Sequence, residues 1–125
     1  MAGILLVEDN EDLRTMLKQS LEKRNHKIIE ASNGREAVNK FKSVMTDLVI
    51  TDILMPEQDG IGLIMELKKV KPELFIIAIS GGGKIGPSNY LDIARTLGAD
   101  AVFPKPFNIN HLIDEVENLT GSLDS

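Results

Sequence analysis

The sequence predicts an α/β fold in which one parallel sheet is covered by helices on both faces, a doubly wound arrangement. Short runs rich in Leu, Val and Ile occur five times along the chain, separated by longer stretches whose apolar residues have helical spacing. The short runs show little alternation between apolar and polar residues, which is typical of strands buried on both faces. A repeated strand–helix order with right-handed crossovers then gives a doubly wound sheet.

The predicted strands are short apolar runs. They are Ile4–Val7, Lys27–Ala31, Leu48–Thr51, Leu74–Ile79 and Ala101–Phe103. The predicted helices are marked by apolar residues three or four positions apart, namely Leu13, Leu17 and Leu21; Ala37, Phe41 and Val44; Ile64 and Leu67; Tyr90, Ala94 and Leu97; and Leu112, Val116 and Leu119. Ligands of doubly wound sheets bind beyond the carboxyl ends of the strands, so the chemistry is expected there.

Several helix boundaries have local signals. Asn33 followed by Glu36 matches a capping box, and Asn108 stands where a cap would precede the last helix. Pro87 suits the first turn of the fourth helix, and Gly98 suits the position just after its end. These signals support the element order deduced from the apolar pattern.

Length and composition favour one cytoplasmic domain. The 125 residues predict a single domain over residues 1–125, with a core from about residue 3 to residue 119 and a loose tail over Thr120–Ser125. The absence of cysteine excludes disulfides and thiolate metal sites. A net charge of −5 and an aromatic content of 4% argue against direct DNA binding. No apolar run is long enough to cross a bilayer, and the N-terminus does not resemble a signal peptide.

Polar residues follow four of the predicted strands. Glu8 and Asp9 follow the first strand, Asp52 ends the third, Ser80 ends the fourth, and Lys105 lies just past the fifth. Strand ends of a doubly wound sheet converge on one edge, where three carboxylates would repel one another unless a cation joined them. An oxygen-only cluster suits Mg²⁺. The alternative for Glu8 and Asp9 is a loop that caps the next helix.

Three of these residues have the chemistry of phosphoryl transfer. A carboxylate such as Asp52 can attack phosphorus when a metal neutralises the approaching charge. Lys105 lies between two prolines, where a cis Lys–Pro bond is accessible, and can pair with a carboxylate or a phosphoryl oxygen. The Ser80 hydroxyl can donate to a phosphoryl oxygen. The alternatives are an Asp in a turn, a surface lysine and a turn serine.

His26 and His111 have no partner spacing and are expected to be exposed.

Together these residues resemble the receiver (response-regulator) domain of bacterial two-component systems, in a stand-alone, chemotaxis-regulator-like form. The resemblance extends from Ile4 to about Leu119. It rests on Glu8-Asp9 after the first strand, Thr51-Asp52-Ile53-Leu54-Met55-Pro56 with Asp59-Gly60 after the third, Ser80 after the fourth and Lys105-Pro106 after the fifth. It implies a flavodoxin-like three-layer sandwich with a parallel five-stranded sheet in the order 2-1-3-4-5.

The resemblance also implies a role for each site residue. Asp9 and Asp52 would bind Mg²⁺ directly with the backbone carbonyl of Leu54, and Glu8 would act through water. Glu8 departs from the family's common Asp-Asp pair, which leaves its contact with the metal open. Asp52 would be the phosphoacceptor, with Lys105 assisting. Ser80 would hold the phosphoryl group, and together with Phe103 it would switch the surface formed by the fourth helix, fifth strand and fifth helix.

The implied function is phosphorelay signal transduction. A sensor histidine kinase or phosphotransfer protein would supply the phosphoryl group, and a downstream protein target would read the switched surface. The chain would not be an enzyme beyond catalysing its own phosphorylation and dephosphorylation. No pattern indicates an oligomeric state, and none indicates a membrane partner.

Three alternatives share parts of this pattern. A phosphatase of the haloacid dehalogenase type needs a second acidic residue two positions after its nucleophile, where this chain has Leu54. A flavodoxin-like cofactor binder needs phosphate-binding and ring-stacking loops, whereas acidic residues follow the first strand here. A non-phosphorylated receiver-like interaction module would be expected to lose Asp52 or Lys105, and both are present.

Overall fold

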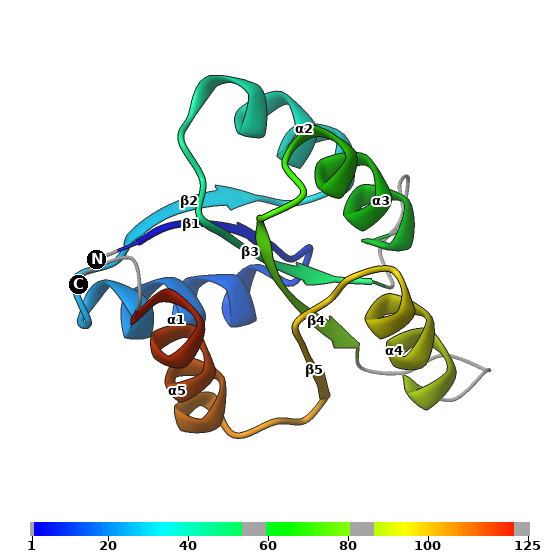
Figure 1. The fold of residues 1–125 in the computed structure, drawn as a ribbon. Helices are drawn as coiled ribbons and strands as arrows, with labels where there is room; N and C mark the ends of the chain where they lie inside the picture. The colour runs from blue at the N-terminus through cyan, green and yellow to red at the C-terminus, as the bar shows by residue number, and fades with distance from the viewer. Residues whose placement is uncertain (1, 54–59, 81–86, 122–125) are drawn as a thin grey trace.

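The chain forms a five-stranded parallel sheet between two layers of helices (Figure 1). A computed structural model describes residues 2–53, 60–80 and 87–121. Its elements are β1 (Gly3–Val7), α1 (Glu11–Glu22), β2 (Lys27–Ala31), α2 (Gly34–Ser43), β3 (Leu48–Asp52), α3 (Gly60–Val70), β4 (Phe75–Ser80), α4 (Pro87–Thr96), β5 (Ala101–Pro104) and α5 (Ile109–Thr120). The strand order is β2-β1-β3-β4-β5 and every pairing is parallel. The predicted fold class and strand order are confirmed.

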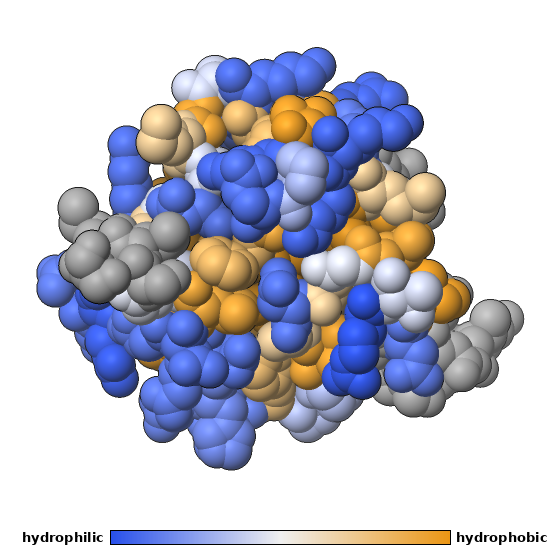
Figure 2. Space-filling model, in the orientation of Figure 1, coloured by the Kyte–Doolittle hydropathy of each residue, from blue (hydrophilic) through white to orange (hydrophobic). Residues whose placement is uncertain are grey.

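The sheet has a hydrophobic core on each face because successive strand side chains point to opposite sides. Ile4 and Leu6 of β1 pack with residues of α1 and α5, including Leu17 and Leu112. Leu5 and Val7 belong to the other core, which residues of α2, α3 and α4 complete. Figure 1 shows α1 and α5 together on one side of the sheet and α2 and α3 on the other. In the space-filling view, hydrophilic residues dominate the outer helices, with apolar residues visible between them (Figure 2).

The strand register brings the predicted polar positions to one edge of the sheet. β1 and β3 are neighbours although they are not consecutive in the chain, so the switch point of strand order lies at their carboxyl ends. Val7 pairs with Thr51, which places Glu8 and Asp52 at the same level. Asp52 pairs with Ile79 in β4, so Ser80 lies one residue beyond it. The topology thus places these groups together before any side chain is considered.

The helix ends confirm most of the predicted caps. Asn33 and Asn108 accept hydrogen bonds from the first backbone N–H groups of α2 and α5. In α2 the Glu36 N–H donates to Asn33 Oδ1 at 2.8 Å, and the Glu36 carboxylate accepts from the Ser32 hydroxyl at 3.0 Å. Pro87 is the first residue of α4, and Gly98 after its end has a φ of +116°, a conformation that favours glycine.

Three sequence-based expectations are wrong. The apolar spacing placed Val44 in the second helix, but α2 ends at Ser43 and Val44 has an extended backbone. The tail does not begin at Thr120, which is buried in the last turn of α5 and donates to the Val116 carbonyl at 2.7 Å. His26 was expected to be exposed but is buried, and its Nδ1 accepts from the N–H of Ala2, just before β1, at 3.1 Å. His111 is exposed as expected.

Candidate functional site

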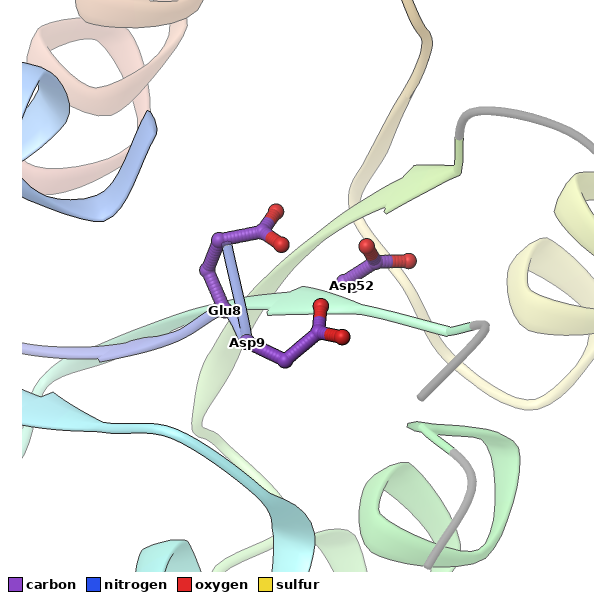
Figure 3. A group of neighbouring side chains, drawn as sticks. All are labelled: Glu8, Asp9 and Asp52. Atoms are coloured by element: carbon purple, nitrogen blue, oxygen red, sulfur yellow. The ribbon is translucent and has the colours of Figure 1, made fainter. Parts of the chain in front are cut away.

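Three carboxylates meet at the carboxyl edge of the sheet. Glu8 and Asp9 follow β1, and Asp52 is the last residue of β3. One carboxylate oxygen from each lies within 4.8 Å of the others. Figure 3 shows the three side chains gathered beside the strand ends. Glu8 is fully buried, Asp52 is 4% exposed and Asp9 is exposed, so the cluster opens to solvent on the Asp9 side. The predicted convergence of these residues is confirmed.

Lys105 brings the compensating positive charge. Its Nζ donates to Asp52 Oδ2 at 2.8 Å and lies 2.9 Å from Glu8 Oε1. The Lys105 backbone N–H donates to the Ser80 carbonyl at 2.7 Å, which fixes the chain just after β5. The Lys105–Pro106 peptide bond is cis. This lysine is therefore an integral part of the acidic cluster and not a surface residue in a turn.

The pKa of Glu8 is strongly perturbed. Burial raises it from 4.5 to about 7, and the nearby charge of Asp52 acts in the same direction. The Asn10 N–H, which donates to Glu8 Oε2 at 3.0 Å, and the Lys105 ammonium lower the pKa but do not offset the burial. Glu8 is thus poised between its neutral and ionised forms near neutral pH.

The pKa of Lys105 shifts in the direction that favours its charge. Burial by itself would lower it, but the hydrogen bonds and charges of Asp52 and Glu8 together raise it above 10.5. Lys105 is therefore a stable cation at neutral pH. Because it pairs with two carboxylates, it neutralises part of the cluster and leaves an excess of negative charge.

Ser80 is the last residue of β4, and its side chain is buried. Its Oγ is fully buried and has no partner within the part of the chain that the structure describes. Leaving a buried hydroxyl without a partner is unfavourable, so a hydrogen-bonding group that came within reach of Ser80 would be stabilised. Of the other predicted site residues, Leu54 lies outside the described residues, so its expected carbonyl contact is not visible.

Phe103 packs into the core. It is half-buried in β5, next to the α1–α5 side of the sheet. Its ring lies 6.1 Å from that of Phe107, between centroids, at 58°. A groove of about 390 Å³ adjoins Phe107 and Lys105, and its lining residues are Leu13, Met16, Lys105, Pro106, Phe107 and Ile109. Phe103 therefore joins the core to the segment that borders the acidic cluster.

Sequence reasoning missed two contacts that hold the cluster. The Asn10 N–H donates to Glu8 Oε2 at 3.0 Å, while its side-chain Oδ1 caps α1 by accepting from the Leu13 N–H at 3.0 Å. Arg14 donates from Nη1 to the Glu8 backbone carbonyl at 2.8 Å. A long cation in the first turns of α1 gives no sequence signal for such a contact.

Comparison with known proteins identifies the family. The family model described as the response regulator receiver domain matches residues 4–117, which is nearly the whole chain. The chain belongs to the response regulator receiver domain family. Receiver domains are modules of two-component signalling, so this chain is a signalling module, and the resemblance inferred from its motifs is confirmed.

Curated relatives of similar length support the assignment to the receiver family. The chain is 35% identical to the response regulator receiver protein CpdR of Brucella abortus over 95% of this chain and 97% of that protein. It is 35% identical to the chemotaxis protein CheY of Thermotoga maritima over 94% and 96% of the two chains. The chain also matches parts of longer proteins, with 13% coverage of a sensor kinase.

A solved receiver structure has the same fold. The response regulator TrrA of Thermotoga maritima, solved in complex with Mg²⁺ and BeF, has a TM-score of 0.82 and 34% identity, covering 95% of this chain and 99% of that one.

None of the helices in the described part of this receiver domain has the length and apolar composition that a membrane-spanning segment needs.

Proposed function

We propose that this receiver domain accepts a phosphoryl group on Asp52 in a Mg²⁺-dependent reaction and thereby switches a protein-binding surface. The observation that supports the proposal most is the position of the Asp52 carboxylate. It lies at the carboxyl edge of the sheet, among the oxygens of Glu8 and Asp9 and 2.8 Å from the Lys105 ammonium. The proposal treats residues 1–125 as one domain, because both hydrophobic clusters pack on a single sheet.

The residues present fit a Mg²⁺ ion. The donors are carboxylate oxygens, which Mg²⁺ prefers, and the cluster is open on the side of Asp9. Asp9 and Asp52 would bind the ion directly with the Leu54 carbonyl, and Glu8 would act through a water molecule. When bound, Mg²⁺ would offset negative charge on the transferring phosphoryl oxygens.

The chain's own residues supply the remaining chemistry. An oxygen of Asp52 attacks phosphorus as the bond from phosphorus to the donor nitrogen breaks, and the imidazole of the donor histidine leaves. Lys105 exchanges its contact with Asp52 for one with a phosphoryl oxygen, which stabilises the charge on the transferred group. The Ser80 hydroxyl, which has no hydrogen-bond partner among the residues that the structure describes, donates to another phosphoryl oxygen. The product is an acyl phosphate, which water later hydrolyses to restore Asp52.

Partner proteins complete the proposed cycle. The donor is a sensor histidine kinase or a phosphotransfer protein, and the apolar groove beside Lys105 offers it contact area next to Asp52. When Ser80 and Lys105 move to hold the phosphoryl group, Phe103 turns inward and alters the surface of α4, β5 and α5 for a downstream protein target. The proposed role is that of a cytoplasmic protein whose output is contact with another protein, without direct DNA binding.

The experiment uses acetyl phosphate as a small phosphodonor. The protein is incubated with Mg²⁺ and acetyl phosphate, and its intact mass is measured. We expect the mass to rise by one phosphoryl group in the wild type and in Asp114→Asn, a control that changes an exposed carboxylate on α5. No adduct should form with Asp52→Asn or with excess chelator.

The variants separate the parts of the proposal. An adduct that persists in Asp52→Asn would remove Asp52 from its role, and an adduct that is insensitive to chelator would remove the metal. If the wild type forms no adduct with Mg²⁺ present, a non-phosphorylated interaction module becomes the better account.

A further inference from the structure

We infer that Arg14 is a positioning residue for the cation site, because its guanidinium fixes the backbone that presents Glu8 and Asp9. The inference rests on the proposed Mg²⁺ site and extends it to a residue outside the carboxylate cluster. Arg14 lies in α1, and its side chain is 17% exposed. Its contact with the cluster is to the backbone carbonyl of Glu8, so it would act through the main chain.

Arg14 makes two directed contacts. Its Nη1 donates to the Glu8 carbonyl at 2.8 Å, and its Nε donates to Glu30 Oε1 at 3.2 Å. Glu30 belongs to the edge strand β2, which pairs with β1. The planar guanidinium therefore connects three elements, the end of β1, the first turns of α1 and the end of β2. A fixed fork of donors suits this role better than the single ammonium of lysine.

The Glu8 carbonyl needs such a partner. The Glu8 N–H donates to the Ala31 carbonyl of β2 at 3.0 Å. β1 ends at Val7, so the carbonyl of Glu8 lies beyond the regular ladder. Arg14 holds that carbonyl in place of a neighbouring strand.

Fixing this carbonyl orients Asp9. The peptide unit is planar, so the Glu8 carbonyl and the Asp9 N–H turn together. On the other side, the Asn10 N–H holds the Glu8 carboxylate at 3.0 Å. The two contacts hold the segment from Glu8 to Asn10 in the conformation that brings its carboxylates beside Asp52. Without Arg14, we expect this segment to sample conformations in which Asp9 faces away from the cluster.

Simple electrostatics predicts the opposite effect. A positive side chain near an acidic cation site repels the cation, so its removal should raise cation affinity. If Arg14 positions the ligands, its removal should lower the affinity. The sign of the change therefore separates the two roles.

Lys18 is a matched control. It lies on the same helix, one turn further along, and its Nζ pairs with the other oxygen of Glu30 at 3.6 Å. Lys18→Met and Arg14→Met each remove one positive charge and keep an unbranched apolar stem. Only Arg14→Met removes the donor to the Glu8 carbonyl.

The test is calorimetric titration of the unphosphorylated protein with Mg²⁺. We expect Arg14→Met to weaken Mg²⁺ binding about tenfold, the loss typical when a group that orients metal ligands is removed. Lys18→Met should bind Mg²⁺ as tightly as the wild type or more tightly. Arg14→Lys, which keeps the charge, should still bind more weakly than the wild type, and it also serves if Arg14→Met fails to fold.

A second readout needs no metal. Amide hydrogen exchange in excess chelator should become faster at Asp9 and Asn10 in the Arg14 variants, and should be unchanged there in Lys18→Met. A purely global loss of stability would instead accelerate exchange in all elements alike.

The outcomes distinguish this inference from the proposed function. If the wild type binds Mg²⁺ and Asp52→Asn binds it more weakly, but Arg14→Met matches Lys18→Met, then Arg14 has no positioning role and the metal site stands. If the wild type itself does not bind Mg²⁺, the proposed metal site and the role of Arg14 both fail.

Discussion

At the scale of single residues, the charges at the sheet edge are balanced only in part. Lys105 lies between Glu8 and Asp52 and neutralises part of their charge, while Asp9 stays exposed beside them. Glu8 bears the largest cost, because it is fully buried. Its pKa of about 7 expresses that cost, since burial favours its neutral form.

The metal-free protein should therefore lose stability as pH rises through the titration of Glu8. Between pH 4.5 and about 7, the folded state still holds the Glu8 proton that the unfolded chain has released. The free energy of unfolding then falls with rising pH in this window, by about 3 kcal/mol at most, and the contribution is constant above it. Urea denaturation in chelator at a series of pH values measures this slope.

Glu8→Gln isolates the contribution of Glu8 from that of other titrating groups. The amide keeps the shape of the side chain and does not ionise, so the variant should lack this part of the slope. The free energy of unfolding of the wild type minus that of Glu8→Gln should decrease from pH 5 to pH 8. Parallel curves would show that Glu8 titrates alike in both states and that its burial is not costly.

The site residues differ in how far sequence could predict them. Asp52, Ser80 and Lys105 were found because each interrupts or follows an apolar run, and strand ends of such sheets meet at one edge. The contacts of Arg14 and the burial of His26 depend on neighbours distant in the chain, at Glu30 and Ala2 respectively. A helical cation and a histidine before a strand look alike in sequence whether or not such neighbours exist.

At the scale of elements, the junction of β3 and α3 is closely packed at Gly60. The Gly60 N–H donates to the Ile53 carbonyl at 3.2 Å, so α3 begins against the end of β3. A Cβ built on Gly60 would lie 2.4 Å from the Asp52 carbonyl oxygen and 2.5 Å from Ile53 Cα. Both are main-chain atoms that cannot move without shifting the strand that positions Asp52.

Gly60→Ala should therefore destabilise the protein. Alanine in a helix normally stabilises by up to about 1 kcal/mol relative to glycine. Overpacking against fixed atoms typically costs about 1–3 kcal/mol, so the steric cost should exceed that gain. The expected net loss is about 1 kcal/mol or more, measured by urea denaturation.

Gly121→Ala is the matched control. Apart from its neighbours in the chain and the backbone of its own helix, no heavy atom of the described residues would lie within 4 Å of a Cβ there, and the residue has a helical φ of −57°. Its stability should equal or slightly exceed that of the wild type. If Gly60→Ala were as stable as the wild type, the β3–α3 junction would accommodate a Cβ with no loss in the free energy of unfolding.

Element positions were predicted better than element ends. The strand predicted over Leu74–Ile79 begins one residue too early, because Leu74 is buried but precedes β4. Val44 continues the helical spacing of α2, yet its backbone is extended and the helix ends one residue earlier. Apolar spacing reports which side chains are buried, and burial continues past the residue at which backbone hydrogen bonding changes.

At the scale of the whole molecule, the sheet topology creates the site. The alternating order of strands and helices predicted two helix layers, but the order 2-1-3-4-5 came only from the resemblance to receiver domains. The spacing of apolar residues within one strand does not indicate which strand lies beside it. Once β1 and β3 are adjacent, their ends bring Glu8, Asp9 and Asp52 together without any distortion of the strands.

The position of the phosphoryl group tests this account most directly. After reaction with acetyl phosphate and Mg²⁺, the protein is digested and the modified peptide is identified by tandem mass spectrometry. The account predicts one phosphoryl group on Asp52, held as an acyl phosphate that neutral hydroxylamine removes. A hydroxylamine-resistant group on Ser80, or a modification spread over exposed residues, would contradict it.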